Sequence, residues 1–149
     1  MPVRTFQVFN DTQIDYILKS PSGPVARDLM KRGIRVQTRA RRNLGGGTGS
    51  GPKRVDTGLL RASIATQLGF STTGLAMRVG TGVYYARWVH DGTGIYGPRQ
   101  KKIVPRTKTH LVFRWKKMGN KLMVVKSVKG MKPNPFLKDA LKAAGPKTL

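Results

Sequence analysis

The basic side chains of this chain lie in two blocks, and this distribution limits where a hydrophobic core can form. The 149 residues include 29 Lys and Arg but only 6 acidic residues, all Asp, for a formal net charge of +23. Residues 1–23 have no net charge, residues 24–54 carry +8, residues 55–97 carry +1 and residues 98–149 carry +14. Because ions are costly to bury, we expect the nearly neutral middle to hold much of the core or a protein interface. The two basic blocks should be solvated or should meet an anionic partner.

Length and composition predict one globular domain over residues 1–149. Domains of about 100–150 residues are common, and apolar residues and glycines together are as frequent here as in globular proteins. No apolar run approaches the roughly 18 residues of a membrane span, and the first residues lack the apolar segment of a secretory signal. The chain has no Cys, which excludes disulfides, cysteine-ligated zinc and cysteine nucleophiles.

Apolar periodicity predicts a long helix over residues 24–44. Its apolar or small residues recur as on one buried helical face: Val25, Leu29, Gly33, Val36, Ala40 and Leu44. The shorter helices expected from the same kind of pattern are residues 11–18, 58–64 and 83–90. A last helix should take Asn134 as its cap, begin at Pro135 and continue through Ala144.

Alternating apolar residues predict a short N-terminal strand and two β-hairpins. The expected strands are residues 3–9, 65–70, 75–79, 111–116 and 122–128. Gly119-Asn120 should form the turn of the second hairpin. In that hairpin Phe113 and Trp115 alternate as core residues do, which favours their burial over a role in base stacking.

These elements predict an α+β fold: a single domain in which a small, mostly antiparallel sheet packs with a long N-terminal helix and a short C-terminal helix. Two loops are expected to be flexible segments that become ordered on assembly. They are the Gly-rich loop at residues 45–54 and the basic loop at residues 95–109.

No motif for catalysis, metal binding or nucleotide binding is found. The Gly-rich loop suggests a phosphate-binding loop, but Pro52 stands where that motif needs Lys, and the loop follows a helix rather than a strand. His90 and His110 are the only imidazoles, too few for a recognisable zinc site. Asp11 and Asp15 are more typical of a helix cap and a solvated acid than of a catalytic pair. We therefore expect no catalytic residue, no cofactor and no metal.

Four segments resemble successive motifs of one protein family. Residues 56–64 (DTGLLRASI) resemble a D/R-T-G-x-L-R-x-S-I block, and residues 79–86 (VGTGVYYA) resemble a V-G-T-x-x-x-Y-A block. Residues 90–93 (HDGT) resemble an E-x-G-T-like step, and residues 134–141 (NPFLKDAL) resemble a closing P-F-L-x-x-A-L helix. In order and spacing the chain is similar to the head-to-tail joining, or tail-completion, proteins of long-tailed bacteriophages, the family that includes minor tail protein Z-like neck proteins. The motifs do not cover the first third of the chain or the basic hairpin.

The resemblance implies a structural virion protein and not an enzyme. Such a protein is made in the cytoplasm of the host bacterium and acts in the phage neck, where the tail is joined to the DNA-filled head. It implies a homo-oligomeric ring of six copies, following tail symmetry. Its partners would be the neighbouring neck, tail-terminator and connector proteins, with non-specific DNA contact also open and no membrane.

The motif residues are candidates for contacts with a neighbouring subunit or partner, although plain core packing or a plain turn explains each of them equally well. This candidate interface comprises Thr57, Gly58, Leu60, Arg61, Tyr84, Tyr85, Trp88, Asp91, Gly92, Thr93, Phe136 and Leu137.

The basic blocks supply candidate contacts to a polyanion or an acidic protein. These residues are Arg35, Arg39, Arg42, Lys53, Arg54, Arg99, Lys101 and Lys102. Two other functions stay open: a basic nucleic-acid-binding module, which would bind with a steep salt dependence, and a small basic nuclease that uses His90 or His110.

Overall fold

The computed structural model describes residues 11–46, 49, 51–53, 56–72, 74–115 and 118–144, and of Asp11 only the backbone. The chain has the expected α+β fold, with a long helix, a C-terminal helix and two separate antiparallel two-stranded sheets. Its elements are α1 (Asp11–Lys19), α2 (Pro24–Leu44), α3 (Leu59–Ala62), β1 (Ala65–Ser71), β2 (Gly74–Gly80), α4 (Ala86–Asp91), the 3₁₀ turn η1 (Gly94–Tyr96), β3 (Leu111–Trp115), β4 (Lys121–Val125) and α5 (Phe136–Ala144). The strand expected at residues 3–9 and the capping side chain expected at Asp11 lie outside the described part. Of the described helices, none has the length and apolar character that crossing a membrane requires.

Helix α2 spans the residues predicted for it. Its first residue is Pro24, where a missing N–H matters little because helix-starting N–H groups have no partner within the helix. The buried residues of α2 are Ala26, Gly33, Val36, Ala40, Asn43 and Leu44. Val25 and Leu29, which we expected on this face, are only half-buried, and Ala26 is buried instead. The buried face is therefore shifted by one residue at the N-terminal end of α2, where α1 contacts it.

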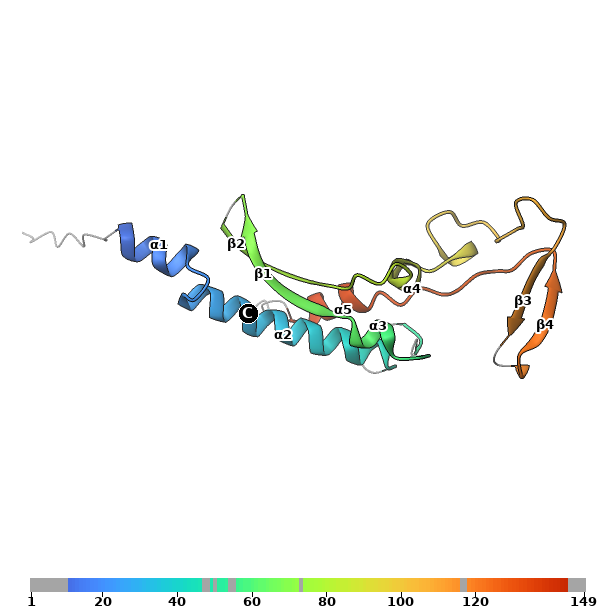
Figure 1. Ribbon diagram of the computed structural model, residues 1–149, viewed down its shortest axis with the longest axis horizontal. Coiled ribbons are helices and arrows are strands. Elements are labelled where there is room, and N and C mark those ends of the chain that lie inside the picture. Colours follow the sequence, from blue (N-terminus) through green and yellow to red (C-terminus); the bar gives the residue numbers. More distant parts are fainter. Residues whose placement is uncertain are drawn as a thin grey trace, which may run out of the picture.

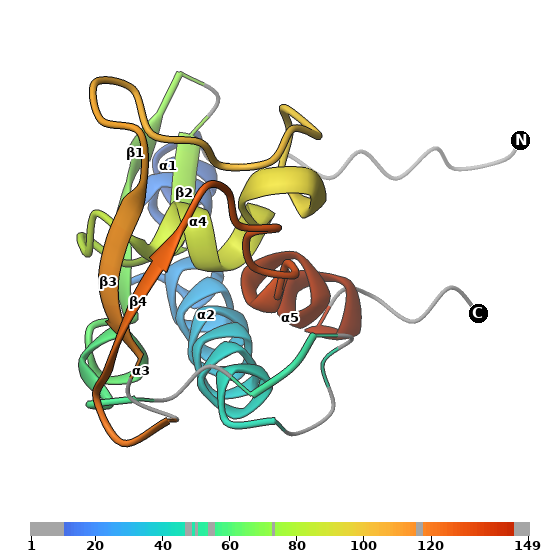
Figure 2. The ribbon, with the colours of Figure 1, turned by 90° about the vertical axis from the view of Figure 1, so that its right-hand side faces the viewer.

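The first hairpin lies along α2, and α5 packs against the same helix from another side (Figures 1 and 2). Strands β1 and β2 pair antiparallel, from Ala65 opposite Gly80 to Ser71 opposite Gly74. A Cβ placed on Gly33 would lie only 2.7 Å from Cγ of Met77 in β2. This glycine weakens an isolated helix by about 1 kcal/mol relative to Ala, but here it lets the hairpin approach α2 closely.

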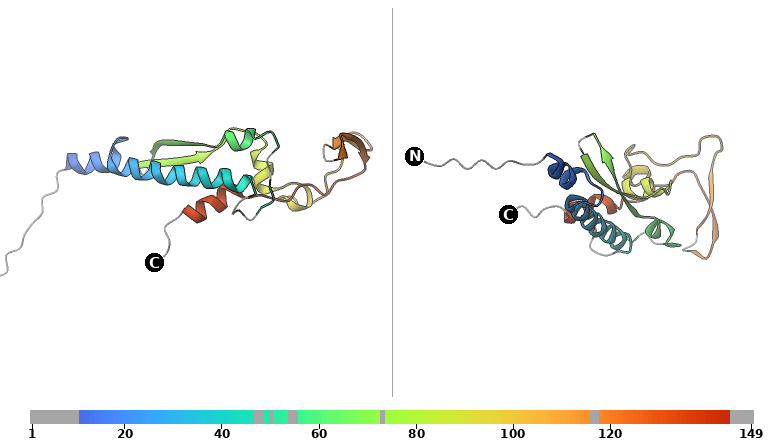
Figure 3. Two further views of the ribbon diagram at one scale, coloured as in Figure 1. Left: turned by 90° about the horizontal axis from the view of Figure 1, so that it is seen from below. Right: turned by 60° about the vertical axis from the view of Figure 1, so that its left-hand side comes forward.

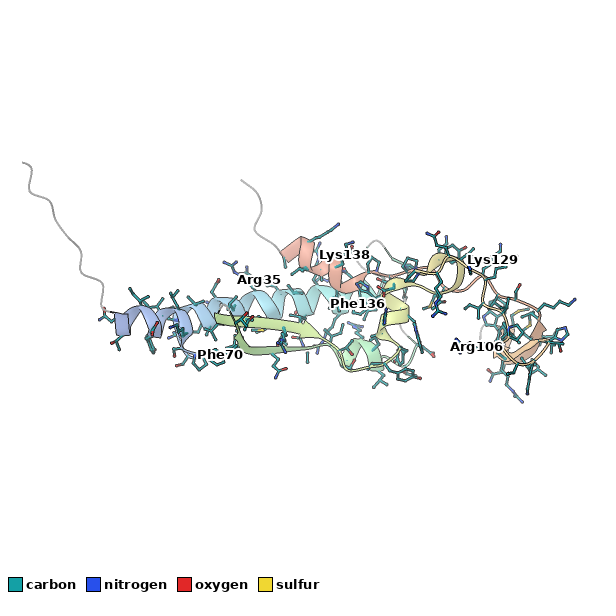
Figure 4. The ribbon with its side chains drawn as sticks, turned by 90° about the horizontal axis from the view of Figure 1, so that it is seen from above. Arg35, Phe70, Arg106, Lys129, Phe136 and Lys138 are labelled. Carbon is teal, nitrogen blue, oxygen red and sulfur yellow. The ribbon has the colours of Figure 1, made fainter. Side chains whose placement is uncertain are left out.

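The core forms where α2, the segment around α3, α4 and α5 meet. Its buried apolar side chains are Val36, Ala40, Leu44, Leu60, Ile64, Ala86, Phe136 and Ala140. Phe136 is the largest fully buried side chain and lies in the middle of the molecule (Figure 4). The neutral middle supplies part of this core, as expected. The basic block around α2 supplies another part, because an amphipathic helix separates its charged and apolar faces.

Two polar residues of α2 fix the chain where it leaves the short helix α3. Nε2 of Gln37 donates to the carbonyl oxygen of Ile64 at 2.7 Å, and Nη2 of Arg41 donates to the same oxygen at 2.8 Å. A helix of four residues has little stability of its own, so these bonds help to set its direction into β1. Arg41 is thus a structural cation, although it belongs to the basic block.

The first turn of α5 differs from the prediction. The helix begins at Phe136, and the carbonyl oxygen of Pro135 accepts the bond from the Asp139 N–H at 2.9 Å. Asn134 is not its cap, because its Oδ1, the atom that would accept a first-turn N–H, has no hydrogen-bond partner among the described residues. The side chain is completely buried, and its Nδ2 donates to the carbonyl oxygen of Pro52 at 2.8 Å. A Cβ on Gly51 would lie 2.6 Å from this side chain, which explains a glycine at that point of the Gly-rich loop.

Residues 97–129, which we call the arm, carry β3 and β4 away from the rest of the chain, the body (Figures 1 and 3). The two strands pair with each other, from Leu111 opposite Val125 to Trp115 opposite Lys121, and form a sheet of their own. The arm hairpin and α1 lie at opposite ends of the long axis of the molecule (Figure 1).

The predicted burial of Phe113 and Trp115 is wrong. Their relative exposures are 38% and 44%, and Val112, Leu122 and Val124 on the same hairpin are still more exposed. The alternation correctly indicated strands, but burial requires a second layer, and among the described residues no helix or strand of the body packs extensively on this hairpin.

Candidate functional site: a cationic pocket at the base of the arm

The two ends of the arm are held together by backbone hydrogen bonds. The Thr93 N–H donates to the carbonyl oxygen of Met131, and the Ile95 N–H donates to that of Lys129, both at 2.9 Å. A Cβ on Gly94 would collide with the Lys129 carbonyl oxygen, and one on Gly130 would collide with that of Thr93. Both glycines also have positive φ, which L side chains rarely adopt. The crossing of the two chains therefore requires glycine at both positions.

The basic loop is tied to this crossing. The Gln100 N–H donates to the Gly97 carbonyl oxygen at 3.0 Å, and Ile103 and Val128 exchange backbone bonds of 2.9 and 3.0 Å. We expected residues 95–109 to become ordered only on assembly. Up to Ile103 the backbone already has partners within the single chain, so the side chains it carries have a defined starting position.

A cavity of about 670 Å³ lies between α4 and the basic loop. Trp88, Asp91, Gly92 and Thr93, which we predicted as interface residues, line it together with Arg99, Lys101 and Lys102, which we predicted as polyanion contacts. The structure thus brings some members of each of the two predicted sets together in one cavity. Sequence reasoning missed Arg87 and Arg106, which also line it. Arg87 was detectable as the residue one helical turn before Asp91, but Arg106 lies on a loop, where no periodicity marks it.

The pocket has five cationic side chains and one carboxylate in its lining. Oδ1 of Asp91 is hydrogen-bonded with Nδ1 of His90 at 2.8 Å, and the other carboxylate oxygen of Asp91 is 3.7 Å from Nε of Arg87. Within the described residues, Arg99, Lys101, Lys102 and Arg106 have no ion-pair partner. Like charges gathered in a concave surface raise the local concentration of anions, so the pocket favours an anionic ligand.

Trp88 adds a flat apolar surface to this charged lining. Its side chain is 52% exposed, and the Tyr84 ring meets it edge-to-face at 5.8 Å between centroids. Tyr84 in turn meets Tyr85 edge-to-face at 5.5 Å. Large aromatic side chains that remain exposed on one monomer are typical of surfaces that bind a ligand or a partner.

The remaining interface candidates lie elsewhere. A second cavity, of about 340 Å³, is lined by Thr57, Gly58, Leu60, Arg61 and Tyr85 around α3. Gly58 has φ +82° at the start of this helix, a conformation that favours glycine.

Four of the candidates serve the core of this chain. Leu60 and Phe136 are buried, and Tyr85 and Leu137 pack against the core. For these four the structure favours the alternative of plain core packing.

The other basic candidates lie along α2 and not at the pocket. Arg35 and Arg42 are exposed and Arg39 is half-buried. Figure 4 shows Arg35 far from Arg106 along the molecule. Lys53 is exposed next to the end of α2, and Arg54 lies outside the described residues.

Comparison of this sequence and structure with family models, with curated proteins and with solved structures found no match. Within the described residues, no group of three or more His, Asp or other ligand side chains is placed to hold a metal ion.

Proposed function

We propose that this protein is a structural component of the phage neck, which assembles as a ring and joins the DNA-filled head to the tail. The observation that carries the proposal is the convergence of the motif segments. Leu60 and Ile64 of the first motif, Ala86 of the second and Phe136 of the last lie in one core. The third motif joins them, because the His90 ring meets that of Phe136 edge-to-face at 5.5 Å. Segments far apart in sequence thus form one structural unit, which is what a shared family fold requires.

The arm supports an assembly role. An isolated two-stranded hairpin is marginally stable in water, and this one exposes apolar side chains on both faces. A chain that presents such a hairpin gains stability when a partner covers it. The arm contains eleven Lys and Arg and no acidic residue, so its partner must not be strongly basic.

In a ring, the partner of the arm is the next copy of the chain. At the opposite end of the molecule, α1 exposes Tyr16, Ile17 and Leu18. Residues 1–23 have no net charge, so the basic arm meets little repulsion there. A contact between unlike ends of identical chains is heterologous and closes into a ring when the rotation allows it.

The test is the fate of particles made without the protein. Deleting the gene should leave filled heads and complete tails that do not unite, as counted by electron microscopy. Adding the purified protein to that lysate should restore joined, infectious particles. Joined particles at the normal level without the protein would show that its function lies elsewhere.

A further inference from the structure

We propose that the cationic pocket at the base of the arm binds a segment of single-stranded nucleic acid, with phosphates on its Lys and Arg side chains and one base against Trp88. This inference rests on the pocket alone and does not depend on the role in the neck. Three features of the pocket support it: the charge of the lining, the size of the cavity and the rigidity of its frame.

The positive charge of the pocket lining favours a ligand that carries several negative charges. Arg99, Lys101, Lys102 and Arg106 come from one short stretch of the chain, and all four are exposed. Asp91, the one carboxylate of the lining, is already engaged by His90 and lies near Arg87. Four uncompensated cations in one cavity match successive phosphates of a strand better than a single small anion.

The size of the cavity and the exposure of Trp88 favour single-stranded over double-stranded nucleic acid. A volume of about 670 Å³ is that of a site for a small or medium-sized ligand, which a double helix is too wide to enter. A half-exposed tryptophan beside a basic groove is the combination that single-strand binders use, because every base has a face that stacks on an aromatic ring. The Tyr84 ring adds to the aromatic surface, since it packs edge-to-face with the Trp88 ring.

The frame is preorganised. The crossing at Gly94 and Gly130 and the bridge between Ile103 and Val128 fix the backbone that carries Arg99, Lys101 and Lys102. Less loop entropy is then lost on binding. A plain basic surface, such as the exposed face of α2 at Lys31 and Arg35, has charge without this concave frame.

The experiment uses the full chain and a fluorescently labelled oligothymidylate of about twelve nucleotides, which forms no duplex. Anisotropy titrations at several salt concentrations should give a log–log slope of about −3, since each of four cations contributes about 0.7 on a single strand. The variant R99Q/K101Q/K102Q should reduce that slope by about 2 and weaken binding at low salt at least about tenfold. These side chains are exposed, so the variant should fold, which circular dichroism checks.

A matched control removes the same charge elsewhere. The variant K31Q/R35Q/R39Q on α2 should leave the slope nearly unchanged. Equal losses in the two triple variants would overturn the proposal, because binding would then follow net charge alone. Equally tight binding of a duplex of the same length, or of polyglutamate with the same number of charges, would also overturn it and would favour a duplex or an acidic protein as the ligand.

The contact between a base and Trp88 can be tested separately by tryptophan fluorescence. Trp88 and Trp115 are the only tryptophans. W115F retains Trp88 alone, and W88F retains Trp115 alone. Oligothymidylate should quench the fluorescence of W115F and leave that of W88F unchanged. Quenching confined to W88F would place the base on the arm hairpin and overturn the proposed site.

Discussion

The two hairpins of this protein are alike in sequence pattern and different in environment. Both are antiparallel pairs with alternating apolar residues, β1–β2 in the body and β3–β4 in the arm. The first lies against α2, where Gly33 makes room for Met77. The second has no such layer, and Phe113 and Trp115 are exposed. The comparison teaches that alternation specifies a strand pair, while the layer that covers it is a property of the rest of the molecule, or of a partner.

The largest effect should come from removing the arm hairpin. Leu111 and Val125 are paired neighbours, so a short Gly-Ser-Gly turn can replace residues 112–124. If the protein has the proposed role in the phage neck, joined particles should be lost completely. The thermal unfolding of the body should be unchanged, because no described residue of the hairpin belongs to the core. Particle counts by electron microscopy and thermal melts measure the two properties.

A control separates the apolar surface of the hairpin from its charge. R114Q/K116Q/K117Q/K121Q removes the cations that the deletion also removes but keeps the apolar side chains. It should retain most of the joining activity. Complete loss in this variant would show that charge, and not apolar contact, is what the hairpin contributes.

Two Phe→Ala substitutions compare how much a phenylalanine in the body and one in the arm contribute to the free energy of unfolding. F136A removes the largest fully buried side chain of the core and should lower the free energy of unfolding by about 3–5 kcal/mol. F113A, on the exposed hairpin, should lower it by less than about 1 kcal/mol in the isolated protein. Urea titrations measure both. Similar losses would mean that the hairpin is covered in solution, and concentration dependence of the F113A effect would identify a second copy as the cover.

A smaller effect is expected at the junction of body and arm. G94A places a Cβ against the Lys129 carbonyl at φ +65°, a strain of about 1–3 kcal/mol. Hydrogen exchange of the Thr93 and Ile95 amides should become at least about tenfold faster, since opening of the crossing is favoured by that strain. The matched control is G69A in β1, where a Cβ has no neighbour within 4 Å. Unchanged exchange in G94A would argue against a rigid junction.

The smallest net effect is expected for G33A. Alanine should stabilise the helix by about 1 kcal/mol, but its Cβ would press on the Met77 side chain. The two should nearly cancel in the wild-type background. In an M77A background the contact is absent, so G33A should stabilise by about the full 1 kcal/mol in urea titrations. The same change in both backgrounds would show that Gly33 and Met77 are not coupled.

The local elements were largely predictable. The apolar stripe and Pro24 marked the bounds of α2, and turn residues marked both hairpins. The start of α5 was misjudged at Asn134, because a sequence shows that a residue can cap a helix but not that its side chain has a closer partner in Pro52. The role of Arg41 was also not predictable. In the sequence it is one cation of the basic block, but in the structure it donates to the Ile64 carbonyl oxygen where the chain leaves α3.

The candidate site was predictable only in pieces. Trp88 and Asp91 were singled out for one reason, and Arg99, Lys101 and Lys102 for another. Nothing in their spacing indicated that they share a cavity. The crossing at Gly94 and Gly130 brings α4 and the basic loop together, and it joins segments about 35 residues apart through backbone contacts that leave no periodic pattern.

The local elements and the two basic blocks follow from the sequence alone, because helix and strand periods and charge are properties of neighbouring residues. The folded chain is needed to show which hairpin has a covering layer, which cations share a pocket and which polar side chains are buried. These depend on contacts between distant segments, and close packing at Gly33, Gly51 and Gly94 fixes where those segments meet.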